Sequence, residues 1–258
     1  MKQPHLLCND KDISEYVILP GDPSRVLRVG KYLDSYEEIA YNREFRTIKG
    51  YYKGVPITVT STGIGGPSAA IAIEELINCG AKYFIRIGSA GAIQPTIKLG
   101  DLIICTAAVR EDGTTSMYIS SKYPATADVR LTNLLLETCE DLGYTHHYGI
   151  VRSHDSFYID NEKEIMDFWK KKNILGSDME TSTLFVLGQL RGVKTASILN
   201  TVVEYESDIK ESIADYAMEG VGSVEGERRE IHLALETFFR LDSSKNEKFI
   251  PNKAVSRY

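Results

Sequence analysis

An apolar, β-favouring run at residues 83–87 gives way to small residues at 88–91, and this junction constrains the fold more than any other stretch. It predicts a buried strand that ends in a small-residue turn, with backbone N–H groups exposed at the carboxyl end of the strand. Arg86 adds a permanent positive charge there, and Ser89 adds a hydroxyl. Such donors together suit a phosphate-sized anion. The alternative is an ordinary strand-to-loop turn in which Arg86 pairs with a carboxylate.

The same arrangement occurs near the N-terminus, where an apolar run at 16–19 leads into a Pro-Gly-Asp-Pro turn and then Arg25 at the start of a short helical pattern. A third glycine-rich turn, at 62–67, precedes an apolar helix predicted over 69–77. Pro67 suits the first turn of that helix, and Gly80 suits its end. The glycines of this turn do not match G-x-G-x-x-G, so the sequence argues against a dinucleotide site of the Rossmann type.

The remaining patterns predict one α/β domain over 1–258, with a mixed central sheet flanked by helices. Antiparallel strands are expected to be joined by Gly50 and Gly54. A long final helix is expected to direct four apolar side chains toward the core: Val224, Ile231, Leu235 and Phe238. The polar residues 243–258 are expected to form a loose tail. Further strands are predicted at 37–41, 45–52, 55–61, 101–109, 148–153 and 194–203, and helices at 128–142, 162–172, 181–190 and 222–241.

Charge and cysteine content narrow the class of protein. The formal net charge of −6 over 258 residues argues against general nucleic-acid binding and does not suggest binding to an anionic membrane. No apolar run has the length of a signal peptide or a membrane span, so a cytoplasmic protein is expected. The four cysteines lie far apart, without metal-binding spacing, and are expected to be reduced core residues.

Several motifs occur together in one order: PGDPSR at 20–25, NREF at 42–45, STGIGGPS at 61–68, RIGSAGAIQP at 86–95, DSFY at 155–158 and SDMETSTL at 177–184. In this order they resemble the nucleoside phosphorylases of the uridine phosphorylase and hexameric purine nucleoside phosphorylase family. The similarity is strongest to the uridine phosphorylase branch. It implies a three-layer fold and phosphorolysis of a nucleoside, most readily uridine or a related pyrimidine nucleoside, to the free base and (deoxy)ribose 1-phosphate in nucleoside salvage or catabolism.

The resemblance assigns the binding of inorganic phosphate, the co-substrate, to a set of donors around Arg86. Phosphate is strongly hydrated, so the site must replace its water with fixed cations and N–H groups. Because guanidinium groups repel each other, phosphate is expected to order them. The set is Gly21, Arg25, Arg86, Gly88 and Ser89, with Arg43 reaching in from an adjacent subunit.

The sugar gains positive character as its bond to the base breaks, so a carboxylate at the sugar hydroxyls can orient it and stabilise that charge. The resemblance gives this role to Glu180, which together with Arg86 forms the predicted catalytic pair. Met179 is expected to pack beneath the sugar, and Asp178 matches an acidic position of the family that is one methylene longer there. His5 is expected to reach the sugar in a neighbouring subunit.

The base site departs from the family pattern. Uridine phosphorylases commonly read the uracil edge with a glutamine and an arginine, where this chain has Asn161 and Lys163. Purine enzymes use an aspartate after the last strand, where this chain has Val203 followed by Glu204. The uncharged end of that strand favours a pyrimidine nucleoside. Phe157 and Tyr158 are expected to line the base pocket, and the polar loop at 204–214 to close over the base.

The resemblance further implies a homo-oligomer with shared active sites, either a dimer or a hexamer built as a trimer of dimers. Glu44, Ile64 and Ser68 match positions that bind a monovalent cation such as potassium between subunits, with a hydrogen-bonded Glu44 as the alternative. No other cofactor is expected. Three rival functions stay open: a purine nucleoside phosphorylase, a nucleosidase that uses water, and a non-catalytic nucleoside-binding protein. The last two have no need of the arginine cluster.

Overall fold

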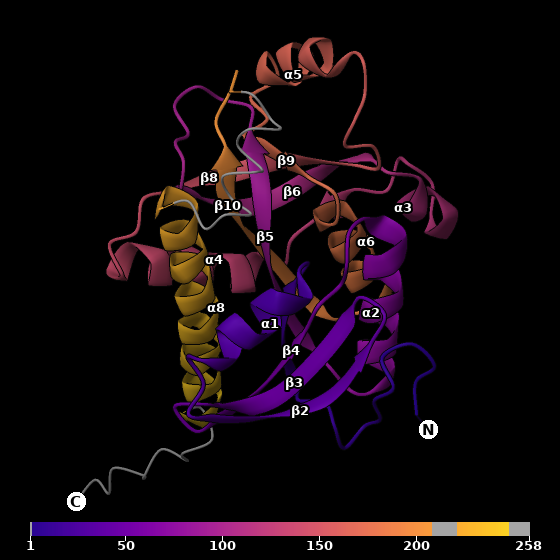
Figure 1. The fold of residues 1–258 in the computed structure, drawn as a ribbon, viewed down its shortest axis with the longest axis vertical. Helices are drawn as coiled ribbons and strands as arrows, with labels where there is room; N and C mark the ends of the chain where they lie inside the picture. Colours follow the sequence, from indigo (N-terminus) through magenta and orange to yellow (C-terminus); the bar gives the residue numbers. More distant parts are fainter. Residues whose placement is uncertain (1, 208–220, 248–258) are drawn as a thin grey trace, which may run out of the picture.

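The computed structural model describes residues 2–207 and 221–247 and places them around one mixed β-sheet (Figure 1). Its strands are β1 (Tyr16–Pro20), β2 (Ser35–Asn42), β3 (Phe45–Tyr52), β4 (Val55–Thr60), β5 (Tyr83–Ala92), β6 (Leu102–Glu111), β7 (Ala125–Thr126), β8 (His146–His154), β9 (Gly176–Asp178) and β10 (Lys194–Val203). Its helices are α1 (Pro23–Gly30), α2 (Gly66–Asn78), α3 (Gly113–Tyr118), α4 (Val129–Asp141), α5 (Glu162–Lys170), α6 (Thr181–Arg191) and α8 (Val221–Glu247). The predicted mixed sheet flanked by helices is confirmed.

Strand β5 is the centre of the sheet. It pairs in parallel with β1 and with β10, and in antiparallel fashion with β9. Because β10 also pairs with β6, which connects through β8 to β9, these strands close on themselves in a barrel-like ring. The antiparallel strands β2, β3 and β4 extend the sheet beyond β1. The carboxyl ends of the parallel strands β1, β5 and β10 therefore meet at one edge, where ligands bind in open α/β sheets.

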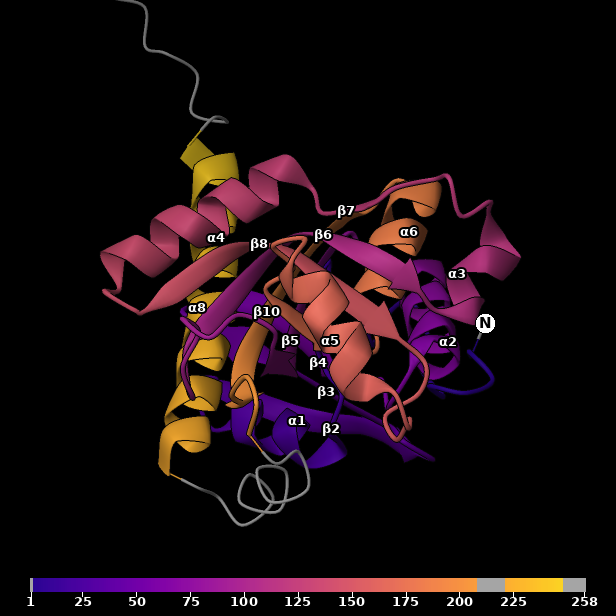
Figure 2. The same ribbon diagram turned by 90° about the horizontal axis from the view of Figure 1, so that it is seen from above.

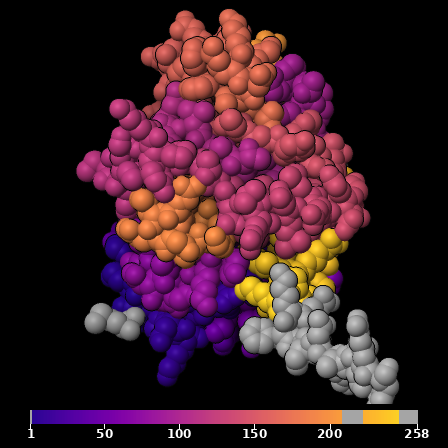
Figure 3. Space-filling model, turned by 180° about the vertical axis from the view of Figure 1, so that it is seen from behind, coloured from indigo at the N-terminus to yellow at the C-terminus, as the bar shows by residue number. Residues whose placement is uncertain are grey.

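Helices cover both faces of the sheet, as the view from above shows (Figure 2). Helices α1, α4 and α8 enclose one apolar core, which includes Ile85 from β5 and Phe238 from α8. Helices α2 and α6 enclose the other core, which includes Phe84 from β5 and Phe185 from α6. Adjacent residues of β5 thus enter opposite cores, as the two-residue period of a strand requires. Helix α5 stands apart at the top of the molecule, seen from the front and from behind (Figures 1 and 3).

Local sequence signals account for several helix ends. The Asp22 side chain caps α1 by accepting a hydrogen bond from Ser24 N, and Pro23 occupies the first turn. Asp128 likewise caps α4 by accepting from Arg130 N and Leu131 N. Such carboxylates satisfy backbone N–H groups that have no partner within the helix. Gly80, predicted to end the apolar helix, follows its C-cap with a φ of +98°, a conformation that favours glycine.

The structure corrects the predicted turn at 88–91, because β5 continues to Ala92. Gly88, Ser89 and Ala90 pair with consecutive residues of β10, so partner-strand hydrogen bonds hold this small-residue segment extended. Gly50 also does not form a turn: it lies within β3, where a Cβ atom would meet Ser35 O at 2.2 Å. Small residues at both places provide room for a close neighbour, which the sequence alone did not distinguish from a turn.

The last helix also differs from its prediction. It extends to Glu247, so 243–247 are helical and not part of a tail, while 248–258 lie outside the described residues. Ile231, Leu235 and Phe238 are buried as predicted, but Val224 is 45% exposed. The short elements α3 and β7 have no counterpart among the predicted elements.

All four cysteines are buried free thiols, in agreement with the predicted reduced core cysteines. Within 2–207 and 221–247, no helix combines the length and apolar character needed to cross a bilayer.

Candidate active site

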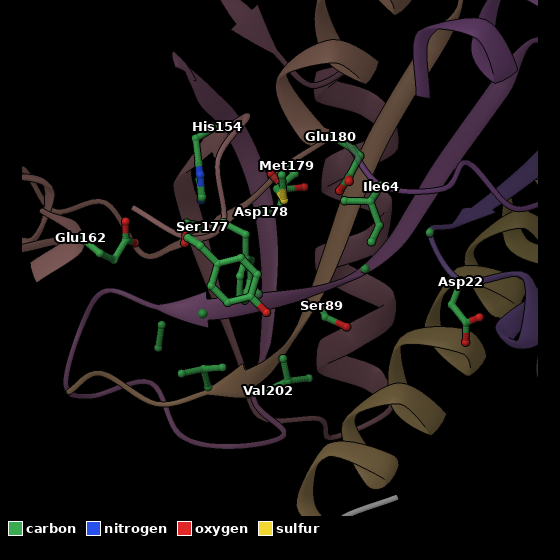
Figure 4. A pocket seen from close by; sticks show the side chains of 18 of the residues that line it. Asp22, Ile64, Ser89, His154, Glu162, Ser177, Asp178, Met179, Glu180 and Val202 are labelled. Carbon is green, nitrogen blue, oxygen red and sulfur yellow. The ribbon is translucent and has the colours of Figure 1, made fainter. Parts of the chain in front are cut away.

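A cavity of about 1490 Å³ opens at the edge where β1, β5 and β10 end (Figure 4). In this view Asp22 lies at one end of the pocket and Glu162 and His154 lie at the other, with Ser89, Met179 and Glu180 between them. Most residues predicted for the site line the cavity: Gly21, Arg25, Glu44, Ile64, Ser68, Arg86, Gly88, Ser89, Phe157, Tyr158, Lys163, Asp178, Met179, Glu180, Val203 and Glu204. Asn161, Arg43 and His5 are not among its lining residues.

Arg86 and Glu180 form a buried ion pair in this cavity. Arg86 Nη2 lies 2.5 Å from Glu180 Oε2, and Arg86 Nε lies 3.0 Å from Asp178 Oδ2. The guanidinium folds back over Gly88, where a Cβ atom would lie 2.5 Å from Arg86 Nη2. Glycine at 88 therefore provides the space that the guanidinium occupies. Arg86 Nη1 is buried and has no hydrogen-bond partner among the described residues, so one side of the group still has N–H to donate.

The glycine-rich turn at 62–67 positions the Glu180 carboxylate. Gly65 N donates a hydrogen bond of 2.6 Å to Glu180 Oε1, whereas Arg86 donates to the other carboxylate oxygen, Oε2. Gly65 has a φ of +91°, which a residue with a side chain adopts only with strain. The conformation of this turn thus supplies a fixed backbone donor that holds Glu180 toward the pocket.

Asp178 is occupied by a network of its own. Its Oδ2 accepts from Thr181 N at 3.0 Å and from Thr181 Oγ1 at 2.6 Å, and its Oδ1 accepts from Ser153 Oγ at 2.6 Å. The N–H of Thr181 belongs to the first residue of α6, so Asp178 also satisfies one backbone N–H at the start of that helix. Its side chain is 1% exposed and holds Arg86 in place.

Arg25 is the second buried guanidinium of the cavity. Its Nη2 donates to Ser89 Oγ at 3.1 Å, and its Nε donates to Glu227 Oε2 of α8 at 2.8 Å. Its Nη1 lies 3.4 Å from Glu230 Oε1. The expectation that phosphate orders the guanidiniums is therefore wrong for Arg25 and Arg86, because buried carboxylates already neutralise and position both groups.

Burial and charge perturb these ionisable groups in opposite directions. Burial alone lowers the pKa of Arg86, but Glu180 and Asp178 outweigh it, so the pKa is raised. Burial raises the pKa of Glu180, against the opposing effect of Arg86. Burial also raises the pKa of Glu230 to about 8, although Arg25 lowers it. Desolvation is thus the largest single contribution at each of these groups, although the two carboxylates together exceed it at Arg86.

Glu44 and Ser68, two of the predicted cation ligands, contact each other. Ser68 Oγ lies 2.7 Å from Glu44 Oε1 and 2.6 Å from Thr62 O. The hydrogen bond from Ser68 lowers the pKa of Glu44. The third predicted ligand, Ile64, is 79% exposed. This geometry matches the alternative of a hydrogen-bonded Glu44, and it leaves the cation site a prediction.

Aromatic and apolar side chains form another part of the cavity lining. Phe157 and Tyr158 pack edge to face, with ring centroids 5.0 Å apart, and Val203 ends β10. Lys163 is 77% exposed at its side chain and pairs with Asp167 at 3.6 Å. Glu204 Oε1 accepts a hydrogen bond of 3.0 Å from Leu99 N, so its carboxylate is held by the loop between β5 and β6. This contact makes Glu204 a poor candidate for a proton donor to a base.

Arg43 and His5 lie away from this chain's own pocket. Arg43 is exposed in the turn between β2 and β3, with a φ of +55°. His5 is 40% exposed at its side chain, and its Nδ1 lies 2.6 Å from Glu75 Oε1. A role for either residue in catalysis therefore requires a second subunit. Of the loop predicted over 204–214, residues 208–214 lie outside the described part of the chain.

Sequence reasoning missed His154, which lines the cavity, and three residues that contact its charged side chains: Gly65, Glu227 and Glu230. Gly65 was noticed only as part of a turn, although its place in a glycine-rich segment was the available signal. The two glutamates lie on α8, about 200 residues from Arg25 in the chain, and no local pattern relates them. His154 directly precedes the DSFY motif, which was its only signal.

Comparisons with known proteins identify the family to which the chain belongs. The family model described as the phosphorylase superfamily matches residues 15–229. The chain is 46% identical to the uridine phosphorylase of Thermococcus kodakarensis, over 76% of this chain and 75% of that protein. It is 41% identical to the guanosine phosphorylase of Halorubrum lacusprofundi, over 76% of this chain and 81% of that protein. The crystal structure of uridine phosphorylase from Vibrio fischeri ES114 superposes with a TM-score of 0.87 at 47% identity, over 93% of this chain and 98% of that one.

The chain belongs to the phosphorylase superfamily. Its sequence is similar to uridine phosphorylases in particular, which confirms the resemblance drawn from the motifs.

Proposed function

We propose that this protein is a nucleoside phosphorylase that cleaves uridine or a related pyrimidine nucleoside with inorganic phosphate. The products are the free base and (deoxy)ribose 1-phosphate. Family membership and the similarity to uridine phosphorylases support this reaction. The observation that carries the proposal is the buried contact between Arg86 and Glu180, which sets an anion-binding cation directly beside a carboxylate suited to a sugar.

Phosphate binds, in this proposal, against Arg86 and Arg25, where Ser89 supplies a hydroxyl. Two observations support this position: Nη1 of Arg86 has no hydrogen-bond partner in the described part of the chain, and Arg25 donates a hydrogen bond to Ser89. Gly21 and Gly88 border the same space: Gly21 allows the anion to approach the backbone, and Gly88 leaves room for the Arg86 guanidinium. A phosphate oxygen then attacks the anomeric carbon of the sugar, the bond from that carbon to the base nitrogen breaks, and the electron pair of that bond leaves with the base.

Glu180 binds the sugar hydroxyls and stabilises the positive charge that develops on the ribosyl group. Its pKa is raised by burial, and the Arg86 charge and the Gly65 N–H both favour the ionised form. Met179 packs against the sugar. Asp178 acts as a positioning residue, since its oxygens are engaged by Arg86, Ser153 and Thr181.

The base occupies the apolar end of the cavity, between Phe157, Tyr158 and Val203. The uncharged end of β10 and the engagement of Glu204 by Leu99 N favour a pyrimidine, which needs no acid at N7. A purine nucleoside is the second candidate, because one relative is a guanosine phosphorylase. Neither Asn161, outside the cavity lining, nor the exposed Lys163 has a geometry that supports base reading.

The active enzyme is a homo-oligomer in this proposal, with a dimer as its minimum unit and a hexamer built as a trimer of dimers as the larger alternative. Arg43 and His5 reach the phosphate and the sugar of a neighbouring subunit. Their positions outside this chain's own cavity support that arrangement. Potassium between subunits, at Glu44, Ile64 and Ser68, belongs to the same proposal, as does a cytoplasmic location, which the buried free thiols support.

The test is product analysis with a panel of pyrimidine and purine nucleosides, each incubated with and without phosphate. We expect uracil and ribose 1-phosphate from uridine only when phosphate is present. Release of base without phosphate would identify a nucleosidase instead. Binding without turnover of any nucleoside would identify a non-catalytic protein. Faster turnover of guanosine than of uridine would select the purine alternative.

A further inference from the structure

His154 is a buried histidine of the cavity for which the mechanism above has no role. It is the last residue of β8, is 8% exposed, and lines the pocket. In the view of Figure 4 its ring lies between Glu162 and Met179, at the end of the pocket away from Asp22. This is the end at which the proposed function places the base, so the inference below rests on that function.

One contact determines which ring nitrogen of His154 carries hydrogen. Nδ1 lies 3.0 Å from the carbonyl oxygen of Ser156. A carbonyl oxygen can only accept a hydrogen bond, so Nδ1 must donate. In a neutral imidazole the other nitrogen, Nε2, then has a free lone pair and can only accept.

The surroundings keep the His154 ring neutral. Burial lowers the pKa of His154, and the positive charge of Arg152 lowers it further. Arg152 is itself 3% exposed and is held by Glu111 and Glu162. Glu162 and Asp178 act on His154 in the opposite direction, but more weakly than burial does. At neutral pH the ring therefore presents an acceptor and not a second donor.

Other polar side chains at this end are less suited to contact a base. Lys163 is exposed and paired with Asp167, and Oε1 of Glu162 lies 3.7 Å from Nη1 of Arg152. Tyr158 is 79% exposed. His154 combines burial, a fixed ring orientation and an acceptor atom, which are the properties that a base-reading group needs.

We propose that Nε2 of His154 accepts a hydrogen bond from a ring N–H of the base that lies between or beside its carbonyl groups. In uracil this group is N3–H. His154 would then be a specificity-determining residue for bases with a protonated ring nitrogen. Cytosine has a lone pair at N3, as adenine has at N1. With either base, this nitrogen and Nε2 of His154 would both be acceptors, and no hydrogen bond could form between them. Guanine and hypoxanthine have N1–H and would satisfy the same acceptor.

The experiment compares kcat/KM for uridine, 3-methyluridine and cytidine at saturating phosphate and neutral pH. Two variants separate the ring nitrogens. His154→Asn keeps an N–H near the Nδ1 position for Ser156 O but has no group at the Nε2 position. His154→Gln places an amide oxygen near the Nε2 position. The control is His146→Asn, because His146 lies on the same strand, has Nδ1 2.9 Å from a carbonyl oxygen, and does not line the cavity.

We expect the wild type to prefer uridine over 3-methyluridine by about 10-fold to 100-fold, the range for one buried hydrogen bond and the group left unpaired. In His154→Asn that ratio should fall toward one, and His154→Gln should restore part of it. His146→Asn should retain the wild-type ratio. An unchanged ratio in His154→Asn would overturn the proposal, as would efficient wild-type cleavage of cytidine.

A binding measurement separates this proposal from the proposed function. Calorimetric titration compares 1-methyluracil, which retains N3–H, with 1,3-dimethyluracil, which lacks it. We expect a preference for 1-methyluracil that His154→Asn removes, whether or not the protein turns over. Failure of every nucleoside to be cleaved would contradict phosphorolysis alone, whereas equal binding of the two uracils by the wild type would contradict the role of His154 alone.

Discussion

Nη2 of Arg86 lies 2.5 Å from Oε2 of Glu180, and both side chains are buried. The group proposed to hold phosphate and the group proposed to hold the sugar are thus in direct contact. Each stabilises the ionised form of the other against the effect of burial. A change in one of them must therefore alter the other, and their effects on turnover and stability should not be additive.

Substitution Glu180→Gln should lower kcat/KM for the nucleoside by about 10²–10³-fold, the range for one well-placed electrostatic contact in a water-excluded site. The amide retains the size of the side chain and its contact with Gly65 N, so the fold should persist. Steady-state kinetics and thermal unfolding measure the two effects. The matched control is Glu74→Gln, whose partner Arg191 is exposed, and a similar fall in that variant would contradict a specific role for Glu180.

Substitution Arg86→Ala should destabilise the protein as well as inactivate it. It leaves Glu180 and Asp178 buried without their cation, and breaking a buried ion pair costs about 3–5 kcal/mol. Urea unfolding measures the loss, and adding Glu180→Gln to Arg86→Ala should recover part of it by removing one uncompensated charge. Arg191→Ala, at a surface pair, should cost less than about 1 kcal/mol. Equal stabilities of the two single variants would contradict the assignment.

Glu230 should make the stability of the protein fall as pH rises. Burial raises its pKa from 4.5 to about 8 in the folded chain, with Arg25, Glu227, Arg86 and the Gly88 N–H facing it. Between these values the folded state retains a proton that the unfolded state has lost. The stabilisation is complete below the pKa of Glu230 in the unfolded chain and is lost as pH rises toward its pKa in the folded chain. Over this range the free energy of unfolding should fall by up to about 1.4 kcal/mol per pH unit.

Unfolding at a series of pH values tests this prediction with Glu230→Gln, which should remove that part of the slope. The control is Glu225→Gln. The hydrogen bond with Arg228 is the main cause that lowers the pKa of Glu225 to about 2. The contribution of Glu225 to the pH dependence should therefore lie at more acid pH. A wild-type slope that Glu230→Gln leaves unchanged would show that Glu230 is ionised throughout.

Much of the fold followed from local patterns. The bounds predicted for the last strand match β10, and Asp128 and Gly143 bracket α4 as the periodicity indicated, because capping and apolar spacing act over a few residues. The extension of β5 through Gly88 was missed because pairing with β10, a partner more than 100 residues away, overrides the turn preference of small residues.

The candidate site was predictable in its members but not in its contacts. Motifs indicated Arg25, Arg86 and Glu180, yet not the two α8 glutamates, Glu227 and Glu230, that lie against Arg25. Buried charges need partners, so the sequence implied that such acids exist, but only the fold determines which acids they are.

Subunit complementation tests whether sites are shared. Arg43 lies outside its own chain's cavity, so Arg43→Ala should inactivate the partner's site, whereas Glu180→Gln inactivates the site of its own chain. In a mixed dimer of the two variants, one site carries both defects and the other carries neither. Unfolding and refolding an equal mixture should therefore restore about one quarter of the wild-type activity, given random pairing in a symmetric dimer. Each variant refolded alone should stay inactive, and a mixture that gains nothing would show that Arg43 does not serve a neighbouring site.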